Sequence, residues 1–426
     1  MITLLDKTKV PFFDYLYLLV IIIYAGLASA FVRDFGDIRT LGNAVALTFT
    51  IVFVLYKRVR NYRGFLVVLG VISIYSALSI TSTGYSSSRF LWQFSQWLIF
   101  LYVGCVICRG YGYKLFVLTE TILYHLAVIS LICWVLLLIM PGQFTSFLQS
   151  FALPAFNDSD RFKSANVLFY TVILSDVTDG YDSAFYFLIR NSGFAWEPGA
   201  FSCFMCLGIG LNMLRTGLKF KNNIPLITFL IALASTQSTT GYSIFGIMLG
   251  IWLFVNKKVG WLIVLIPAAL FVFNLPFMGD KLGLKLEGFN EATLANASGG
   301  EYYDRLLSLS IMWDEFLRHP LFGYGFSIPE IERLELHTWS GIGRLLAQFG
   351  IFMTILFVVS LFRSAKRIGY YYYSQYGIVI AIAVLGSMIS YMLWMQPFFI
   401  AIWLSCLFIE NPTTKTTNAH LQYQQI

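Results

Sequence analysis

Few side chains in this sequence suit acid–base chemistry near neutral pH, and His337 has the most suggestive position. The four histidines stand at positions 125, 319, 337 and 420. His337 precedes a long apolar stretch, and Arg344 follows about two helical turns later if that stretch is a helix. Such a histidine has access to solvent and an apolar wall beside it, which suits a general base. A single histidine is nevertheless more often structural than catalytic.

A second group of candidates lies in residues 190–199, RNSGFAWEPG. Pro198 suits the first position of a helix, so the Glu197 carboxylate would face the positive end of that helix dipole. The start of a capped helix explains Glu197 and Pro198 without any further function, but it does not require Arg190. An arginine at this position is well suited to binding a phosphate or a carboxylate.

An amphipathic helix and a turn hold the remaining candidates. Apolar side chains recur at helical spacing at positions 302, 306, 309, 313 and 316, and His319-Pro320 ends the pattern. Arg305 falls at the edge of this stripe, so in a helix lying on the membrane interface it would reach the lipid headgroups. The residues HPLFGYG at 319–325 predict a turn that includes His319 and Tyr324, in which two glycines allow a tight backbone. The same pattern is typical of a plain structural turn.

The sequence contains no P-loop, no HExxH motif, no EF-hand loop and no acidic cluster of the DxD type. We therefore predict no metal ion and no cofactor. The net charge of +7 does not indicate nucleic acid, because the basic residues form short runs between apolar stretches rather than a basic patch interleaved with aromatic residues. All six cysteines lie in apolar stretches, where we expect small packing residues.

Membrane helices must position these candidates. Hydrophobic residues make up 58% of the chain and charged residues only 12%, whereas a soluble domain usually carries about 25% charged residues. Because a span needs ~20 mostly apolar residues, the sequence predicts an all-α polytopic membrane protein with about 12 spans (roughly 10–13). They form a single transmembrane domain, residues 1–410. The predicted spans are 14–32, 41–56, 65–80, 90–108, 115–140, 198–215, 224–236, 241–256, 260–276, 339–362, 376–393 and 396–410.

The distribution of lysine and arginine orients these spans. When the N-terminus is placed in the cytoplasm, every cytoplasmic connection carries Lys or Arg, whereas the short outer loops carry only Arg33, Arg39 and Arg89. The polar tail at 411–426 is then cytoplasmic as well. Two long connections, 141–197 and 277–338, fall on the outer side. Loops of that length are usually functional or disordered, and their aromatic and apolar residues favour a functional role. The site candidates lie in or beside these two loops.

Taken in order, these segments resemble the superfamily of O-antigen polymerases and O-antigen ligases, which are bacterial envelope glycosyltransferases. The resemblance rests on Arg190 followed by Gly-x-x-x-Glu-Pro, an arginine-bearing helix at 305, His-Pro-Leu-x-Gly-x-Gly at 319–325, and His337 before a span containing LLAQFG at 345–350. It covers residues 190–355, whereas the N-terminal half is similar in topology only. Thr338 and Gln348 depart from the family, in which Asn and an acidic residue are common at these places.

The resemblance implies a GT-C-like membrane enzyme that uses undecaprenyl-pyrophosphate-linked oligosaccharide. It implies that His337 is the base and that Arg190 and Arg305 bind pyrophosphate. The further candidates are Arg344 for the pyrophosphate, and Glu197, His319 and Tyr324 for substrate binding or a structural role. A sugar pyrophosphate is a good leaving group, so a base and fixed positive charge suffice for a direct displacement that inverts the anomeric carbon.

These considerations predict a polymerase that joins lipid-linked repeat units of O-antigen, or of a related capsule or exopolysaccharide, on the periplasmic side of the bacterial inner membrane. One open alternative is an O-antigen ligase that transfers finished polymer to lipid A–core. Another, from a different class, is a flippase or transporter of lipid-linked oligosaccharide, against which the lack of internal repeats and of charges within spans weighs. The expected partners are the lipid-linked oligosaccharide and the phospholipid bilayer, with a polysaccharide chain-length regulator as a further candidate.

Overall fold

The computed structural model describes residues 11–27, 36–59, 63–83, 88–151, 164–173, 189–261, 263, 305–326, 328 and 340–409. These residues are mostly helical, which agrees with the all-α membrane architecture predicted from the sequence. Four helical stretches are long and apolar enough to cross a membrane: Gly64–Thr83, Phe90–Tyr111, Lys114–Ile139 and Gly341–Tyr371. Shorter apolar helices of 10–17 residues accompany them.

The described helices follow the predicted spans closely. In the first half of the chain they are α1 (Phe12–Leu27), α2 (Gly36–Lys57), α3 (Arg63–Thr83), α4 (Ser88–Tyr111), α5 (Lys114–Ile139) and α6 (Pro141–Ser150). In the second half they are α8 (Pro198–Thr216), α9 (Ile224–Ser235), α10 (Thr239–Val255), α13 (Arg305–Arg318), α15 (Gly341–Tyr371), α16 (Ile378–Ser390) and α17 (Pro397–Phe408). Short 3-10 segments, η3 (Val259–Trp261) and η5 (Leu393–Met395), follow α10 and α16. The predicted span at 260–276 lies outside the described residues except for positions 260, 261 and 263.

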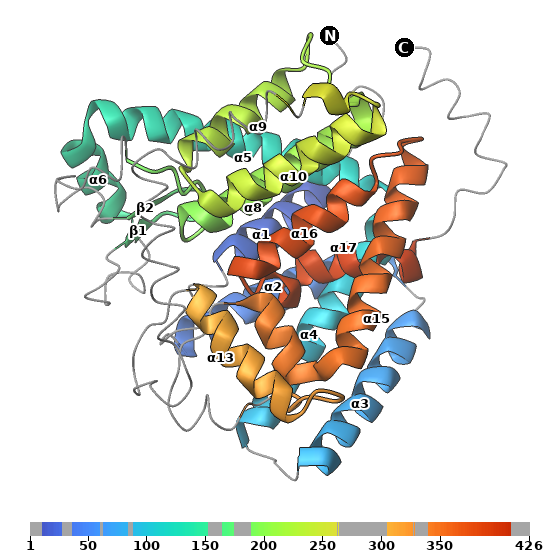
Figure 1. Ribbon diagram of the computed structural model, residues 1–426. Helices are drawn as coiled ribbons and strands as arrows, with labels where there is room; N and C mark the ends of the chain where they lie inside the picture. The colour runs from blue at the N-terminus through green and yellow to red at the C-terminus, as the bar shows by residue number, and fades with distance from the viewer. Residues whose placement is uncertain are drawn as a thin grey trace.

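The helices form one bundle (Figure 1). Helices α5, α8, α9 and α10 pack together along one side, and α16 joins α8 and α10 to α15. Helix α17 packs along α4 and beside α15, while α3 lies at the edge of the bundle. Aromatic side chains fill the centre: the Phe204 ring lies 5.0 Å from that of Phe194 and 5.5 Å from that of Phe399 on α17. These edge-to-face contacts tie α8 to α17.

Contacts between helix ends gather basic residues at one end of the bundle. Lys57, at the end of α2, pairs with Asp14 at the start of α1, with 2.6 Å between Nζ and Oδ2. Arg215, near the end of α8, pairs with the fully buried Glu120 of α5 at 2.8 Å. Arg367, near the end of α15, donates to backbone carbonyls at the end of α17. These are the helix ends for which the sequence predicts the cytoplasmic side.

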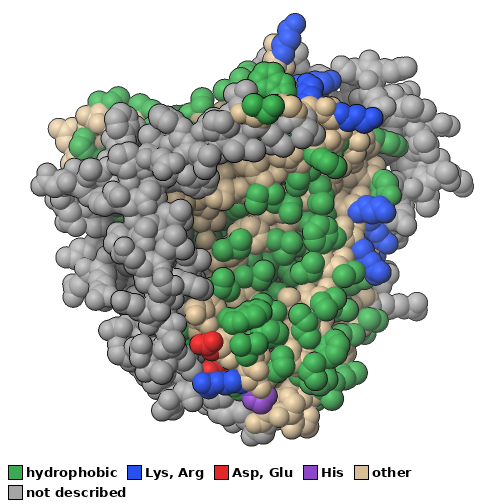
Figure 2. Space-filling view, in the orientation of Figure 1, with side chains coloured by type: hydrophobic (Ala, Val, Ile, Leu, Met, Phe, Trp, Pro, Cys, Tyr) green, Lys and Arg blue, Asp and Glu red, His purple; other side chains and the backbone are tan. Residues whose placement is uncertain are grey.

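The surface of the bundle is apolar between its charged rims. Figure 2 shows a broad hydrophobic face with Lys and Arg side chains along its upper and right-hand rim and a small charged group with a histidine at its lower edge. Large apolar side chains point outward from the described helices; on α3 they include Leu66, Val67, Val71 and Ile74. Such a face is typical of a surface that lies against lipid.

The first long loop contains structure that the sequence analysis did not predict. After α6 the described part holds an antiparallel hairpin of β1 (Ser164–Asn166) and β2 (Thr171–Ile173), in which Ala165 pairs with Val172. Side chains of α5, α6 and the hairpin form a second apolar cluster apart from the main core. The loop is therefore a small packed unit over its described residues.

Helix α13 stands where the amphipathic helix was predicted, and it ends at Arg318, before His319-Pro320. The sequence predicted an apolar stripe facing the membrane interface, and it did not predict which face of α13 packs on the protein. Trp313 is 47% exposed, whereas Glu315 is fully buried. The reason is the packing of α13 on α15: a Cβ at Gly343 would lie 2.9 Å from the Cβ of Met312. Because Gly343 has no side chain, the side of α13 that carries Met312 packs against α15.

Helix α15 is broken, although the sequence predicted an uninterrupted span at 339–362. Gly350 has φ 63° and ψ −172° within it, a conformation that is essentially restricted to glycine. A Cβ at Gly350 would lie 2.4 Å from the carbonyl oxygen of Leu321. The break thus needs a glycine both for its backbone and for its neighbour.

The turn after α13 fills this break. The amides of Tyr324 and Gly325 donate to the carbonyls of residues 347 and 348, at 3.0 and 2.6 Å. The amide of Ile351 donates to the carbonyl of Pro320 at 2.8 Å. Because the backbone groups released by the break lie within an apolar bundle, these hydrogen bonds are what makes the break tolerable.

Helix α3 also binds to the turn after α13 and to the break in α15. The Ser79 hydroxyl donates to the carbonyl of Gly323 at 2.8 Å. The Tyr75 hydroxyl lies 3.1 Å from the carbonyl of Leu321 and also donates to that of Phe349. Two side chains one helical turn apart thus attach α3 to both the turn and the break.

We expect Gly350→Ala to lower the unfolding temperature in detergent, because a side chain in this conformation costs about 1–3 kcal/mol before any clash. Gly246→Ala is the matched control, since a Cβ at Gly246 in α10 meets nothing within 4 Å and alanine favours a helix over glycine. Thermal unfolding followed by tryptophan fluorescence measures both variants. Equal shifts for the two would contradict the constraint at the break.

Candidate functional site

Consecutive residues at the C-terminal end of α16 contact different helix starts. The Ser390 hydroxyl hydrogen-bonds to the Thr240 hydroxyl in the first turn of α10, with 2.9 Å between the oxygens. The Tyr391 hydroxyl donates to Oε1 of Glu197, the residue immediately before α8. We call residues 390–392 the hub, because α8, α10 and, as described next, α15 all meet there.

Arg344 reaches the hub from α15. Its Nη1 donates to Sδ of Met392 at 3.2 Å, and the side chain is half-buried. Helix α15 begins at Gly341, where the Ser340 hydroxyl accepts from the Gly343 amide at 3.1 Å. Arg344 therefore stands in a capped first turn, where the helix dipole adds to its positive charge. This arrangement suits an anionic group.

Two glycines allow α8 and α15 to approach Tyr391 closely. A Cβ at Gly199, in the first turn of α8, would lie 1.9 Å from the Tyr391 hydroxyl oxygen. A Cβ at Gly341 would lie 2.2 Å from the Tyr391 carbonyl oxygen. Tyr391 is only 1% exposed, so its hydroxyl is held in one place against the Glu197 carboxylate.

Glu197 is the N-cap residue of α8 and Pro198 takes the first helical position, as the sequence predicted. The Glu197 side chain makes no capping hydrogen bond to the amides of α8. Its carboxylate is instead bonded by Tyr391 on another helix. A simple capping role therefore does not account for a glutamate at this position.

Arg190 is half-buried in a segment whose backbone is fixed on both sides. The Trp134 indole donates to the carbonyl of Ile189 at 2.7 Å. The Asn191 amide donates to the carbonyl of Ser235 at 3.0 Å, and the Asn191 side chain donates to the Ser235 hydroxyl at 2.9 Å. Arg190 is thereby held between α5 and the end of α9.

The same segment continues to the hub along the end of α1. The Trp196 amide donates to the carbonyl of Gly26 at 3.3 Å. A Cβ at Gly26 would lie 2.6 Å from the ring of Phe194. The backbone from Arg190 to Glu197 is therefore fixed by contacts with α1, α5 and α9, so both residues have a defined backbone position.

His319 and Tyr324 form a separate pair on the turn after α13. Their rings meet edge to face, with 4.5 Å between centroids. Burial, and next the adjacent Glu315 carboxylate, raise the pKa of Tyr324 to about 12. Glu315 itself pairs with Arg318 at 3.1 Å. The Tyr324 phenol is therefore neutral at physiological pH and acts only through hydrogen bonds and packing.

The structure bonds Glu197 and Arg344 to adjacent residues of the hub, Tyr391 and Met392. Tyr324, with the His319 ring against it, is bonded to α15 about one helical turn beyond Arg344. Arg305 is the first residue of α13, but its side chain is outside the described part of the chain, as is the whole of His337. Both residues remain predictions of the sequence.

Sequence reasoning missed Tyr391 and Met392. Neither belongs to a motif, and the only local signal is SYMLWMQP at 390–397, which ends α16 and starts α17 at Pro397. Gln348, where the resembling family commonly has an acidic residue, is fully buried. Its Nε2 donates to the carbonyl of Phe326 at 3.2 Å. An ionised carboxylate has no proton to donate there, so the departure has a structural reason.

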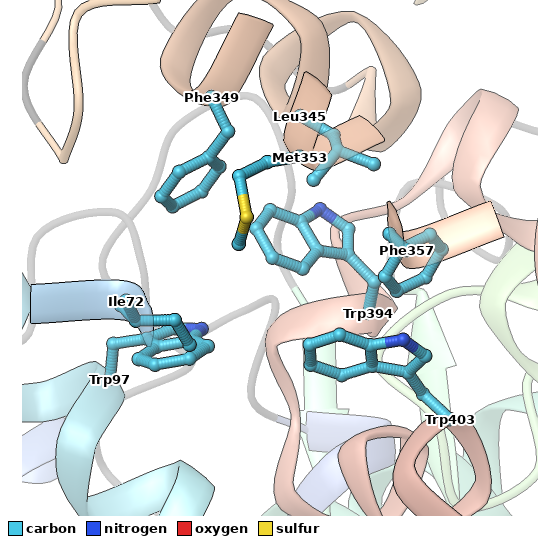
Figure 3. A pocket seen from close by; sticks show the side chains of 8 residues that line it. All are labelled: Ile72, Trp97, Leu345, Phe349, Met353, Phe357, Trp394 and Trp403. Atoms are coloured by element: carbon cyan, nitrogen blue, oxygen red, sulfur yellow. The ribbon is translucent and has the colours of Figure 1, made fainter. Parts of the chain in front are cut away.

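An apolar pocket lies beside the site, between α3, α4, α15 and α17 (Figure 3). It starts at Leu345, the neighbour of Arg344, and continues across the break in α15. The lining residues are Ile72, Trp97, Leu345, Phe349, Met353, Phe357, Trp394 and Trp403. The lining offers no acid or base, and the space that it encloses holds no more than about one water molecule.

No protein-family model matches this chain, and neither does a curated protein or a solved structure. The resemblance to O-antigen polymerases and ligases therefore rests on the ordered motifs.

Tyr391→Phe removes one hydroxyl from the hub and should lower any activity that depends on Glu197. A hydrogen bond to a charged group contributes about 1.5–3 kcal/mol, which corresponds to roughly a ten- to hundredfold loss in kcat/KM. Tyr376→Phe is the matched control, because the Tyr376 hydroxyl bonds to Asn256 at 3.0 Å near the opposite end of α16. It should leave kcat/KM unchanged.

A double-mutant cycle separates this role from a general loss of packing. In a Glu197→Ala background, Tyr391→Phe should cost no further activity if the hydroxyl acts through the carboxylate. A loss as large as in the unmodified protein would show that Tyr391 does not act through Glu197.

Proposed function

We propose that this protein is a membrane glycosyltransferase that polymerises lipid-linked oligosaccharide repeat units. The glycan leaves undecaprenyl pyrophosphate and is transferred to a sugar hydroxyl of a second lipid-linked unit at the outer face of the bacterial inner membrane. The displacement is direct, inverting and independent of a metal ion. About 12 spans in a GT-C-like arrangement and cytoplasmic termini belong to the same proposal.

The observation that supports this proposal best is the convergence of Glu197 and Arg344 on the hub. They come from the two motif regions of the chain and are bonded to adjacent residues, Tyr391 and Met392, at the end of the bundle opposite the paired basic residues. If those basic ends face the cytoplasm, the hub lies at the outer interface, where a lipid pyrophosphate is presented.

The chemistry follows from the residue types. In this proposal His337 takes the proton from the acceptor hydroxyl as its oxygen forms a bond to the anomeric carbon. The bond from that carbon to the pyrophosphate oxygen breaks with its electron pair, and negative charge grows on the leaving group. The guanidinium groups of Arg190, Arg305 and Arg344 stabilise that charge by paired hydrogen bonds.

Glu197 has a role in holding sugar. An ionised carboxylate offers about four lone pairs to donors, and Tyr391 fixes its orientation. Sugar hydroxyl groups are donors of the required kind. The carboxylate would orient a sugar ring beside the arginines, which lowers the barrier by positioning rather than by bond making.

The decisive experiment uses purified protein in liposomes with defined lipid-linked repeat units, and the products are separated by length. A ladder of lengthened lipid-linked glycan is expected. Transfer of a preformed polymer to lipid A–core without a ladder would indicate a ligase. Movement of the lipid-linked sugar across the bilayer without joining would contradict an enzymatic function altogether.

His337→Ala should abolish ladder formation at an unchanged protein level, because it removes the proposed base. His125→Ala is the control; this exposed histidine of α5 bonds to the Tyr15 hydroxyl at 2.8 Å. Full activity of the His337 variant would exclude that residue as the base.

Arg190→Ala and Arg305→Ala should each reduce the rate by about 100-fold, the usual loss when one donor to a developing anion is removed. Lysine at either position should restore the rate only in part, because it lacks the planar pair of donors. Arg363→Ala, an exposed change on the basic half of α15, is the control. Full rescue by lysine would count against paired hydrogen bonding to pyrophosphate.

A further inference from the structure

Helix α6 is an amphipathic helix without a charged residue. The chain turns at Met140, and α6 runs away from the line of α5 at the edge of the bundle (Figure 1). Apolar side chains at positions 144, 147, 148 and 151 share one face, since these spacings match a helical turn. Gln143, Ser146 and Ser150 lie on the polar side.

Only half of this apolar face is covered by the protein. Phe144 and Leu148 are buried in the cluster formed with the hairpin. Phe147 is 57% exposed and Phe151 is 66% exposed. The ring of Phe147 stacks on Phe144 with 6.3 Å between centroids and meets Phe151 edge to face at 5.2 Å. The exposed rings therefore form a ridge anchored on the buried ones.

Along the chain this ridge follows the outward surface of α5. Ile132, Val135 and Ile139 lie on one face of the last turns of α5 and are 58%, 46% and 69% exposed. Helix α5 is long and apolar enough to span a membrane, so these side chains face lipid. Phe147 in α6 and Phe151 directly after it come next in the chain, and the polar side of α6 suits the headgroup layer.

The unit that α6 supports is bonded to the Arg190 segment. The amide of Thr171 in β2 donates to the carbonyl of Gly193 at 2.7 Å. The Trp134 indole, packed against the same cluster, donates to the carbonyl of Ile189. Helix α6, the hairpin and residues 189–193 are therefore connected by packing and hydrogen bonds.

We propose that α6 is seated in the outer leaflet, with Phe147 and Phe151 among the acyl chains of the phospholipids, and that it holds the Arg190 segment at the depth of the lipid phosphates. The seating of α6 stands without the proposed function, whereas the consequence for Arg190 rests on it. Acyl chains are the expected occupant rather than a second copy of the protein, because the ridge is two rings wide and continuous with a lipid-facing helix.

Site-directed spin labelling tests the seating. Phe147→Cys and Phe151→Cys are labelled separately in vesicles of phosphatidylcholine and phosphatidylglycerol, and collision with oxygen and with a water-soluble nickel chelate is measured. Both labels should favour oxygen, as should Ile139→Cys on α5. Gln149→Cys, on the exposed polar side of α6, should favour the nickel chelate. The six native cysteines are buried, and the unmutated protein measures their background.

Each other result overturns the seating. Labels at 147 and 151 that favour the nickel chelate would place α6 in water. Labels that neither reagent reaches would mean that protein covers the ridge, whether another segment or a second copy. Because each position is labelled alone, one poorly folded variant leaves the other to decide.

The consequence for Arg190 is measured in the polymerisation assay. Phe147→Asp should raise the KM for the lipid-linked donor by about tenfold without a matching fall in kcat, whereas Phe147→Leu should leave both unchanged. If the two variants have the same KM, α6 does not set the position of Arg190. If the unmodified protein forms no product, the proposed function fails while the spin-label result still stands.

Discussion

A backbone amide or carbonyl that makes no hydrogen bond within its own membrane helix is not reached by water, so its hydrogen-bond partner must come from elsewhere in the protein. This requirement governs α15, which breaks at Gly350 inside an apolar bundle. The turn at 320–325 supplies amides and a carbonyl to the break, and α3 supplies two hydroxyls. One glycine thereby ties together parts of the chain that are distant in sequence, and it also fixes where α13 lies, because the turn that follows α13 is bound there.

Because of the break, the candidate site is carried by a short half-helix that is fixed at both ends. The half-helix before Gly350 carries Arg344 in its first turn and the carbonyls that receive the turn in its last. One end is held by the hub through Met392 and Gly341, and the other by the turn. Neither the rotation nor the depth of Arg344 then depends on the long lipid-facing half beyond the break. A group that must meet a phosphate within a few tenths of an ångström benefits from such support.

Sequence reasoning predicted most helices of this fold because apolar length is a direct requirement of the bilayer. It placed Pro198 and the end of α13 for equally local reasons. It predicted an apolar stripe on α13 but not the face that packs on the protein, because periodicity cannot show that Gly343 admits Met312 and leaves Trp313 outside. The break at Gly350 was invisible among 33 glycines, and the hub was invisible because it consists of contacts between residues that share no motif. The role of Tyr391 can be recognised only once the structure places α8 and α15 on either side of it.

The attachment of α3 has a consequence for how the chain is assembled. The carbonyls that Tyr75 binds belong to residues 246 and 274 positions later in the sequence. Because synthesis adds roughly 5–20 residues per second, the last partner of Tyr75 emerges on the order of 14–55 seconds after Tyr75 itself. Until then a nascent chain holds α3 in the bilayer without its outer anchor. The early helices of this protein are therefore in the membrane before the final third of the chain has been synthesised. The rate of synthesis limits how early the bundle can close.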